Sequence, residues 1–139
     1  MTSAPESGAA RPRPDALRGN CMGAAVLLII QFGLGMGVNL FVSLPSGKSF
    51  FATVFGSATL AAHAIVAVVL LGAAIGALAR AIRSRRAILL TSAGLAAVLA
   101  AGIAGASFAG GQSNGASLAM ALATAVAMFC YLAAVFSLR

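Results

Sequence analysis

The chain has 139 residues, of which 61% are hydrophobic and 8% are charged. Soluble domains contain about 45–50% apolar and about 25% charged residues, so this composition excludes a soluble fold and predicts that the lipid bilayer is the solvent. The formal net charge is +7. It does not indicate a nucleic-acid-binding surface, because the basic residues flank hydrophobic runs, where they orient helices and contact anionic lipid head groups.

The first segment, residues 1–20, is polar and rich in Pro, Ala, Ser and Arg, which is typical of a disordered tail. It contains both acidic residues of the chain, Glu6 and Asp15. The apolar run over residues 21–44 follows it. This run is longer than the apolar core of a signal peptide, which has about 7–15 residues, and no convincing cleavage site ends it, so we expect an uncleaved first span.

Three further apolar runs follow, over residues 53–79, 87–109 and 116–138. Each run has the ~20-residue length that crosses the hydrocarbon core of a bilayer. A turn with Pro and Gly lies at 45–49, an Arg-rich loop at 80–86 and a Gly-rich polar turn at 110–115. Because the connections are short, sequential helices must be antiparallel neighbours. We predict an all-α fold, an antiparallel four-helix transmembrane bundle formed by residues 21–139.

The basic residues predict the orientation of the bundle. The tail, the 80–86 loop and the C-terminus hold eight Arg residues, whereas the two other loops hold only Lys48. Basic residues in short loops stay on the cytoplasmic side. We therefore predict a multi-pass protein of a bacterial cell (plasma) membrane, with both termini in the cytoplasm. The use of Arg over Lys and the abundance of Ala and Gly favour an actinobacterial source.

Each predicted span contains a stripe of small residues. The stripes are Gly33 and Gly37, then Gly72 and Gly76, then Ala97, Ala101 and Gly105, and finally Ala119, Ala123 and Ala127. Helices in lipid associate through close packing of small residues, so the stripes predict a tight bundle without a wide channel. An alternative role for one glycine face is oligomerisation.

His63 is the only Asp, Glu, Lys, Arg or His residue inside the predicted spans. At a rise of 1.5 Å per residue, it lies in the outer half of the second span, near the depth of Thr124, with Asn39 and Met120 slightly further out. Ionisable residues in membranes are costly and are functional candidates. Three roles stay open. A neutral His63 hydrogen-bonds Thr124, Asn39 or a carbonyl group; it ligates haem or a metal; or it relays protons or contacts a quinone or a lipid head group.

The chain lacks the residues that most other chemistry needs. No Asp or Glu lies in a predicted span, which argues against proton-coupled antiport and against a small multidrug exporter. No nucleophilic triad, metal-binding cluster or phosphate-binding loop can be assembled, so we predict no catalytic residues and favour a non-enzymatic protein. A single His is also a poor zinc site. Cys21 and Cys130 lie at different depths and face a reducing side, so no disulfide is expected.

Two short stretches resemble a known family. Gln31-Phe32-Gly33-Leu34-Gly35 and Ala62-His63-Ala64-Ile65-Val66-Ala67 are similar to one four-helix half of the haem A synthase type, which has a Q-x-x-L-G-like first helix and a haem-ligating His early in the second. The resemblance implies that His63 is an axial ligand of haem. The residues themselves predict no cofactor, and haem b is the alternative. The family has a second His early in the fourth helix, whereas this chain has none there. His with Met is an allowed haem-ligand pair, which leaves Met120 as the candidate second ligand.

These observations favour a small non-enzymatic subunit, assembly factor or scaffold that packs through a Gly/Ala face. Its expected partners are the lipid bilayer and either another membrane protein or a second copy of the chain. The alternatives are a haem-binding redox or haem-handling protein centred on His63, and a small solute channel or exporter. The chain also resembles the small four-span actinobacterial membrane proteins of unknown function.

Overall fold

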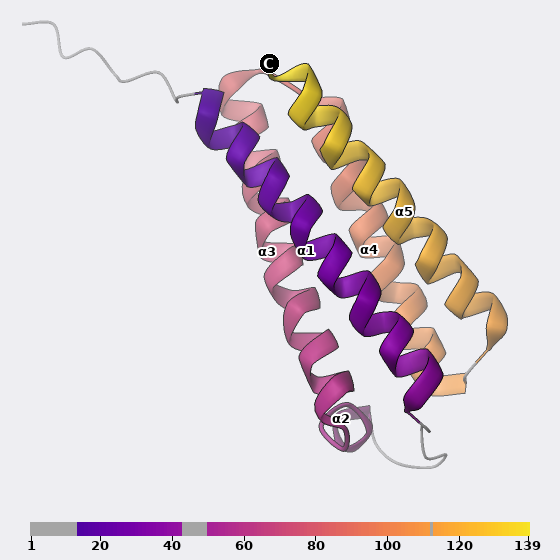
Figure 1. Ribbon diagram of the computed structural model, residues 1–139. Helices are drawn as coiled ribbons and strands as arrows, with labels where there is room; N and C mark the ends of the chain where they lie inside the picture. Colours follow the sequence, from indigo (N-terminus) through magenta and orange to yellow (C-terminus); the bar gives the residue numbers. More distant parts are fainter. Residues whose placement is uncertain (1–13, 43–49, 112) are drawn as a thin grey trace, which may run out of the picture.

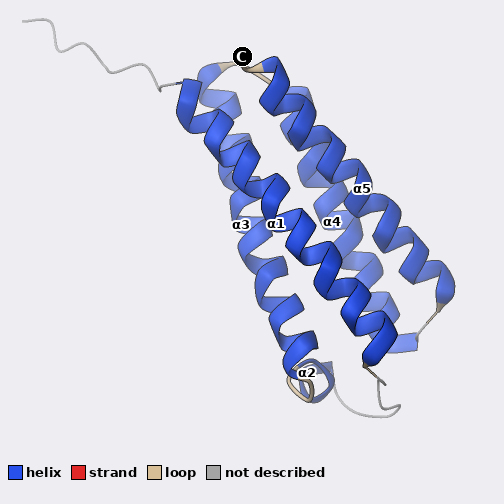
Figure 2. Ribbon diagram, viewed as in Figure 1, coloured by secondary structure: helices blue, strands red, loops and turns tan. Residues whose placement is uncertain are grey.

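The computed structural model describes residues 14–42, 50–111 and 113–139. These residues form helices and contain no β-strand (Figure 2). The helices are α1 (Pro14–Phe41), α2 (Phe50–Val54), α3 (Ala58–Ser84), α4 (Ile88–Gly111) and α5 (Asn114–Ser137). The four long helices pack as a bundle, which confirms the predicted all-α class.

The long helices form a ring in which each one contacts two neighbours. Helix α1 packs against α3 and α5, and α4 also packs against α3 and α5. Neighbouring helices run antiparallel, and the C-terminus lies at the same end of the bundle as the start of α1 (Figure 1). We call this the arginine-rich end, because the α3–α4 turn lies there, and we call the opposite end, where α2 lies, the α2 end.

All four long helices are long and apolar enough to cross a membrane. The candidate spans are Ala16–Phe41, Ala58–Ser84, Ile88–Gly110 and Asn114–Ser137. Their outward faces carry many exposed large apolar side chains, which suits contact with lipid acyl chains. The chain is therefore a polytopic membrane protein, as its composition predicts.

The first helix starts earlier than predicted. Helix α1 begins at Pro14, so the last seven residues of the predicted tail are helical. Proline suits a first helical position because the N–H group that it lacks has no partner there, and Leu17 is already buried against the core with 3% exposure. The remainder of the predicted tail, residues 1–13, lies outside the described residues, as does the 43–49 segment that follows α1.

The second long helix is displaced toward the C-terminus relative to the predicted 53–79 span. Helix α3 extends over Ala58–Ser84, so Arg80 and Arg83 are helical rather than in a loop. Arginine is a good helix former and its side chain can extend from a helix end to polar surroundings, so these charges do not end the helix. The residues before α3 form α2, which was not predicted.

A tight turn joins α3 to α4 at the arginine-rich end. Arg85 has a φ of 54°, in the left-handed region. The N–H of Arg86 donates to the Ala81 carbonyl and the N–H of Arg85 donates to the Ile82 carbonyl. These bonds satisfy carbonyl groups that the end of a helix leaves open. Ala87 also has a φ of 54°, so a left-handed residue lies on each side of Arg86 where the chain reverses.

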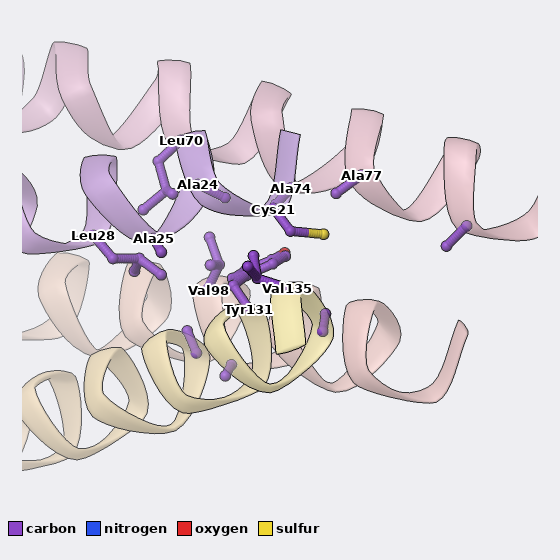
Figure 3. Packing of buried hydrophobic residues seen from close by; sticks show 14 of the residues in the cluster. Cys21, Ala24, Ala25, Leu28, Leu70, Ala74, Ala77, Val98, Tyr131 and Val135 are labelled. Carbon is purple, nitrogen blue, oxygen red and sulfur yellow. The ribbon is translucent and has the colours of Figure 1, made fainter. Parts of the chain in front are cut away.

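The main core lies in the half of the bundle nearer the arginine-rich end and is built largely of alanine (Figure 3). Small side chains let helices in lipid approach closely. Tyr131 is the large exception, because its ring is fully buried. The core residues are Leu17, Cys21, Ala24, Ala25, Leu28, Leu70, Ala74, Ala77, Ala81, Ala97, Val98, Ala127, Tyr131, Ala134, Val135 and Leu138. A smaller cluster at the α2 end centres on Val38 and Leu60.

The predicted small-residue stripes divide into inward and outward positions. Ala97 and Ala127 are buried in the core, and Gly105 faces another helix. A Cβ atom added at Gly33 or Gly72 would instead meet nothing within 4 Å. The spacing of small residues alone therefore does not distinguish packing within the bundle from an exposed outer surface.

Candidate functional site

His63 lies in the second turn of α3, near the α2 end of the bundle, and its imidazole ring faces α1. The side-chain amide nitrogen of Gln31 in α1 lies 3.0 Å from Nε2 of the ring, in a hydrogen bond. Gln31 is 9% exposed and His63 is partly buried. This bond links α1 to α3 and supplies a hydrogen-bond partner to both side chains inside the bundle.

The pair has unused hydrogen-bonding capacity. In the structure the Gln31 amide donates to an unprotonated Nε2, which leaves the proton on Nδ1. A half-turn of the amide would present Oε1 to a protonated Nε2 and preserve the bond. His63 Nδ1 and Gln31 Oε1 are both buried and have no hydrogen-bond partner in the described part of the chain. Buried polar atoms normally have partners, so these two atoms are candidates for binding something else.

Two glycines bring Met120 into the same cluster. A Cβ atom at Gly35 would lie 3.2 Å from Cε1 of His63, 3.7 Å from Nδ1 and 4.0 Å from the Met120 methyl carbon. A Cβ atom at Gly105 would lie 3.3 Å from the Met120 sulfur. Met120 therefore reaches from α5 between α1 and α4. We call Gln31, Gly35, His63, Gly105 and Met120 the His63 cluster, to which all four long helices contribute.

The structure changes the partner expected for His63. Thr124 donates its hydroxyl to the Met120 carbonyl of its own helix at 2.8 Å, and Asn39 is exposed on the outer surface. Gln31 makes the bond instead. The prediction compared depths along the helices, whereas the rotation of α1 about its axis decides which side chain faces His63. Gln31 and Gly35 are four residues apart and share one helix face, but the sequence does not show that this face meets His63.

The structure brings the two predicted cofactor ligands, His63 and Met120, to the same stretch of α1, because an atom of each lies within 4.0 Å of the position of a Gly35 Cβ. Haem, however, does not fit the cluster as it is packed. Nε2 is engaged by Gln31, and the Cε1 edge of the ring lies against the α1 backbone at Gly35. A porphyrin bound to Nδ1 would require α1 to move away from α3.

A second buried polar group lies in the main core. The Tyr131 ring is 0% exposed, and its hydroxyl has no hydrogen-bond partner in the described part of the chain. Gly94 permits this position, because a Cβ atom there would lie 2.9 Å from two ring carbons. Cys21 lies in the same core (Figure 3), and both Cys21 and Cys130 are free thiols. Tyr131 was not among the predicted site residues, because an aromatic residue in an apolar run is typical of lipid-facing surface.

Polar contacts near the arginine-rich end include one between helices and several within a helix. Asn20 in α1 donates to the Ala73 carbonyl of α3 at 3.0 Å, which links these two helices a second time. Arg80 donates to the Gly76 carbonyl of its own helix. The guanidinium of Arg139 lies 4.6 Å from the centre of the Phe136 ring. These contacts stabilise helix ends and leave the arginine side chains exposed, where they can reach lipid head groups.

Comparisons with known proteins identified no relative of this chain. The resemblance to one half of the haem A synthase type is carried only by the two short stretches around Gln31 and His63, and it stays a prediction. No protein-family model, no curated protein and no solved structure matches this chain.

Proposed function

We propose that the protein is a non-enzymatic membrane component, a small subunit, assembly factor or scaffold that packs laterally against another membrane protein or a second copy of itself. The supporting observation is the outward face of α1, at the positions of Gly19, Gly23 and Gly33. A Cβ atom added at any of these three glycines would meet nothing within 4 Å. The chain itself therefore does not need glycine at these positions.

These glycines share one helix face with two exposed β-branched residues. At about 100° per residue, Gly19, Gly23, Val26, Ile30 and Gly33 fall on one side of α1, and all five are exposed. We call them the α1 outer face. Glycine inside a helix is less favourable than alanine by roughly 0.5–1 kcal/mol. Small residues let transmembrane helices approach closely and gain packing energy, which offsets this cost when a second helix lies on the face.

The test is a set of leucine substitutions on open glycines. Gly23→Leu and Gly33→Leu should abolish association of the solubilised protein on native gels and in light-scattering measurements of mass, because a long side chain separates the helices. Gly102→Leu is the matched control, since Gly102 lies on α4 and is equally open. A monomeric wild type without a bound partner, or the same loss of association with Gly102→Leu, would contradict the proposal.

A second candidate function is haem binding or haem handling by His63. It is favoured by the placement of Met120 beside His63 at Gly35, although the haem would enter only if α1 moved. The test is the absorbance spectrum of the detergent-purified protein, oxidised and reduced, beside His63→Ala. A redox-sensitive Soret band that the variant loses would support this function, and a featureless spectrum after expression with ample haem would exclude it.

The third hypothesis, a solute channel or exporter, requires a polar path through the bundle. The structure has an open groove between α1 and α5, but its lining is apolar, with Phe32, Ala125, Met128, Phe129 and Leu132. Such a groove suits an acyl chain or another helix and offers nothing to a polar solute. This groove in the described part of the chain therefore does not support a channel.

A further inference from the structure

We propose that the His63 cluster binds a cuprous ion, Cu(I), between Nδ1 of His63 and the thioether sulfur of Met120. This inference is independent of the lateral packing proposed above, because the α1 outer face and the His63 cluster lie on different sides of α1. It starts from Nδ1 of His63, a buried atom without a hydrogen-bond partner in the described part of the chain.

The imidazole of His63 has the surroundings of a metal ligand. A metal-binding His ordinarily donates its other ring N–H to an oxygen acceptor, which fixes the tautomer and the ring orientation. Gln31 lies 3.0 Å from Nε2 and supplies that acceptor when its amide presents Oε1. The proton is then on Nε2, and the lone pair of Nδ1 is free. Nδ1 is on the same side of the ring as Gly35 and Met120.

The thioether of Met120 supplies the second ligand. Its methyl carbon lies 4.0 Å from the position of a Gly35 Cβ, which is also 3.7 Å from Nδ1. Its sulfur lies beside Gly105. Methionine has three rotatable bonds, and neither glycine has a side chain that obstructs rotation. Binding of the ion would require rotation about these side-chain bonds, which would turn the sulfur from Gly105 toward Nδ1.

The ligand chemistry selects the ion. Thioether and imidazole ligands favour Cu(I), whereas Mg²⁺ and Ca²⁺ need several oxygen ligands and zinc sites need three or four protein ligands. No group of three or more His, Cys, Asp or Glu residues that could hold a metal occurs in the described part of the chain. A monovalent ion is also less costly to transfer into a low-dielectric bundle than a divalent one.

The experiment uses the full chain in detergent with Cys21→Ala and Cys130→Ala, because thiolates would compete for Cu(I). Anaerobic titration with Cu(I) against a chromophoric chelator should show one bound ion per chain. Binding should be lost in His63→Ala and in Met120→Leu, which conserves volume. Gln31→Leu should weaken binding by about 10–100-fold, as expected for the loss of a residue that orients a metal ligand.

Met36→Leu is the matched control, because Met36 is 42% exposed on the outer side of α1 and should not affect binding. Circular dichroism identifies any variant that fails to fold, and X-ray absorption of the bound wild type supplies a readout that needs no variant: one sulfur and one nitrogen ligand. Cu(I) binding that persists in His63→Ala or in folded Met120→Leu overturns the proposal, as does the absence of binding in the cysteine-free protein.

Discussion

Gly94 and Gly102 lie on the same helix and have opposite surroundings. A Cβ atom at Gly94 would lie 2.9 Å from ring carbons of Tyr131, whereas one at Gly102 would meet nothing within 4 Å. Gly94 is therefore required by packing inside the bundle, and Gly102 is not. The sequence shows only that both are glycines in an Ala-rich helix, so their different roles depend on which side of α4 faces α5.

Replacement of Gly94 by alanine should lower the free energy of unfolding by about 1–3 kcal/mol, the usual effect of an added methyl group in a filled core. The chain has no Trp, but Cys21 and Cys130 are buried, so a thiol-reactive dye reports unfolding in detergent. Gly102→Ala is the control and should not destabilise the protein. Equal melting temperatures for the two variants would show that the Tyr131 ring shifts to make room for the added methyl group without a loss of stability.

Because Gln31 and His63 share a hydrogen bond, the effects of replacing them on the free energy of unfolding should not be additive. We expect Gln31→Leu, His63→Leu and the double variant to give a coupling energy of roughly 0.6 kcal/mol, and at most about 1.7 kcal/mol, as found for hydrogen bonds between transmembrane helices. The measurement is reversible unfolding in mixed detergent. Additive effects of the two substitutions would show that the bond contributes nothing to stability.

At the scale of elements, the α3–α4 turn shows how a short connection constrains its residues. Arg85 and Ala87 both have a φ of 54°, and a left-handed conformation costs a residue with a Cβ atom about 1–2 kcal/mol. The Arg86 and Arg85 N–H groups close the end of α3, which offsets part of this cost. The packing of α3 against α4 offsets the remaining strain in the turn.

Ala87→Gly should therefore raise the free energy of unfolding by about 1 kcal/mol, because glycine adopts a positive φ without steric cost. Ala79→Gly is the matched control. Ala79 is exposed within α3, so its replacement should lower stability by roughly 0.5–1 kcal/mol. A decrease in both variants would mean that the turn stores no strain at Ala87. Thermal unfolding with the thiol-reactive dye distinguishes these results.

The number of long helices was predicted correctly from the apolar runs. The helix boundaries were predicted less well, because charged residues were taken as helix ends. Four spans were expected and four long apolar helices are present. Helix α1 starts before the predicted boundary at 21, and α3 continues through Arg80 and Arg83. Charge sets where a helix leaves the hydrocarbon, but backbone hydrogen bonds continue beyond that depth. Helix boundaries and membrane boundaries are therefore different properties.

At the scale of the whole molecule, α5 closes the ring by packing against α1. The α3–α4 turn, the start of α1 and the C-terminus consequently share one end (Figure 1). The exposed side chains of Arg18, Arg80, Arg83, Arg85, Arg86 and Arg139 belong to segments at this end. This concentration of positive charge at one end predicts a single favoured orientation in a membrane.

Reporter fusions test this orientation. A reporter that is active only in the cytoplasm should be active when it is fused after Arg139, because basic residues in short loops are retained on the cytoplasmic side. A fusion truncated after Gly110 should report the opposite side, since one span fewer precedes it. An external signal at Arg139 would show that the charge bias does not control insertion.

The sequence by itself determined the class of the protein, the number of spans and the position of its only intramembrane His, because apolar content, run length and charge are local properties. Only the tertiary structure paired His63 with Gln31, placed Met120 beside Gly35 and buried Tyr131 against Gly94. In a soluble helix, the hydrophobic stripe indicates which side faces the core. In a membrane bundle the lipid is as apolar as the core, so the inward face is decided by the packing of the four helices together.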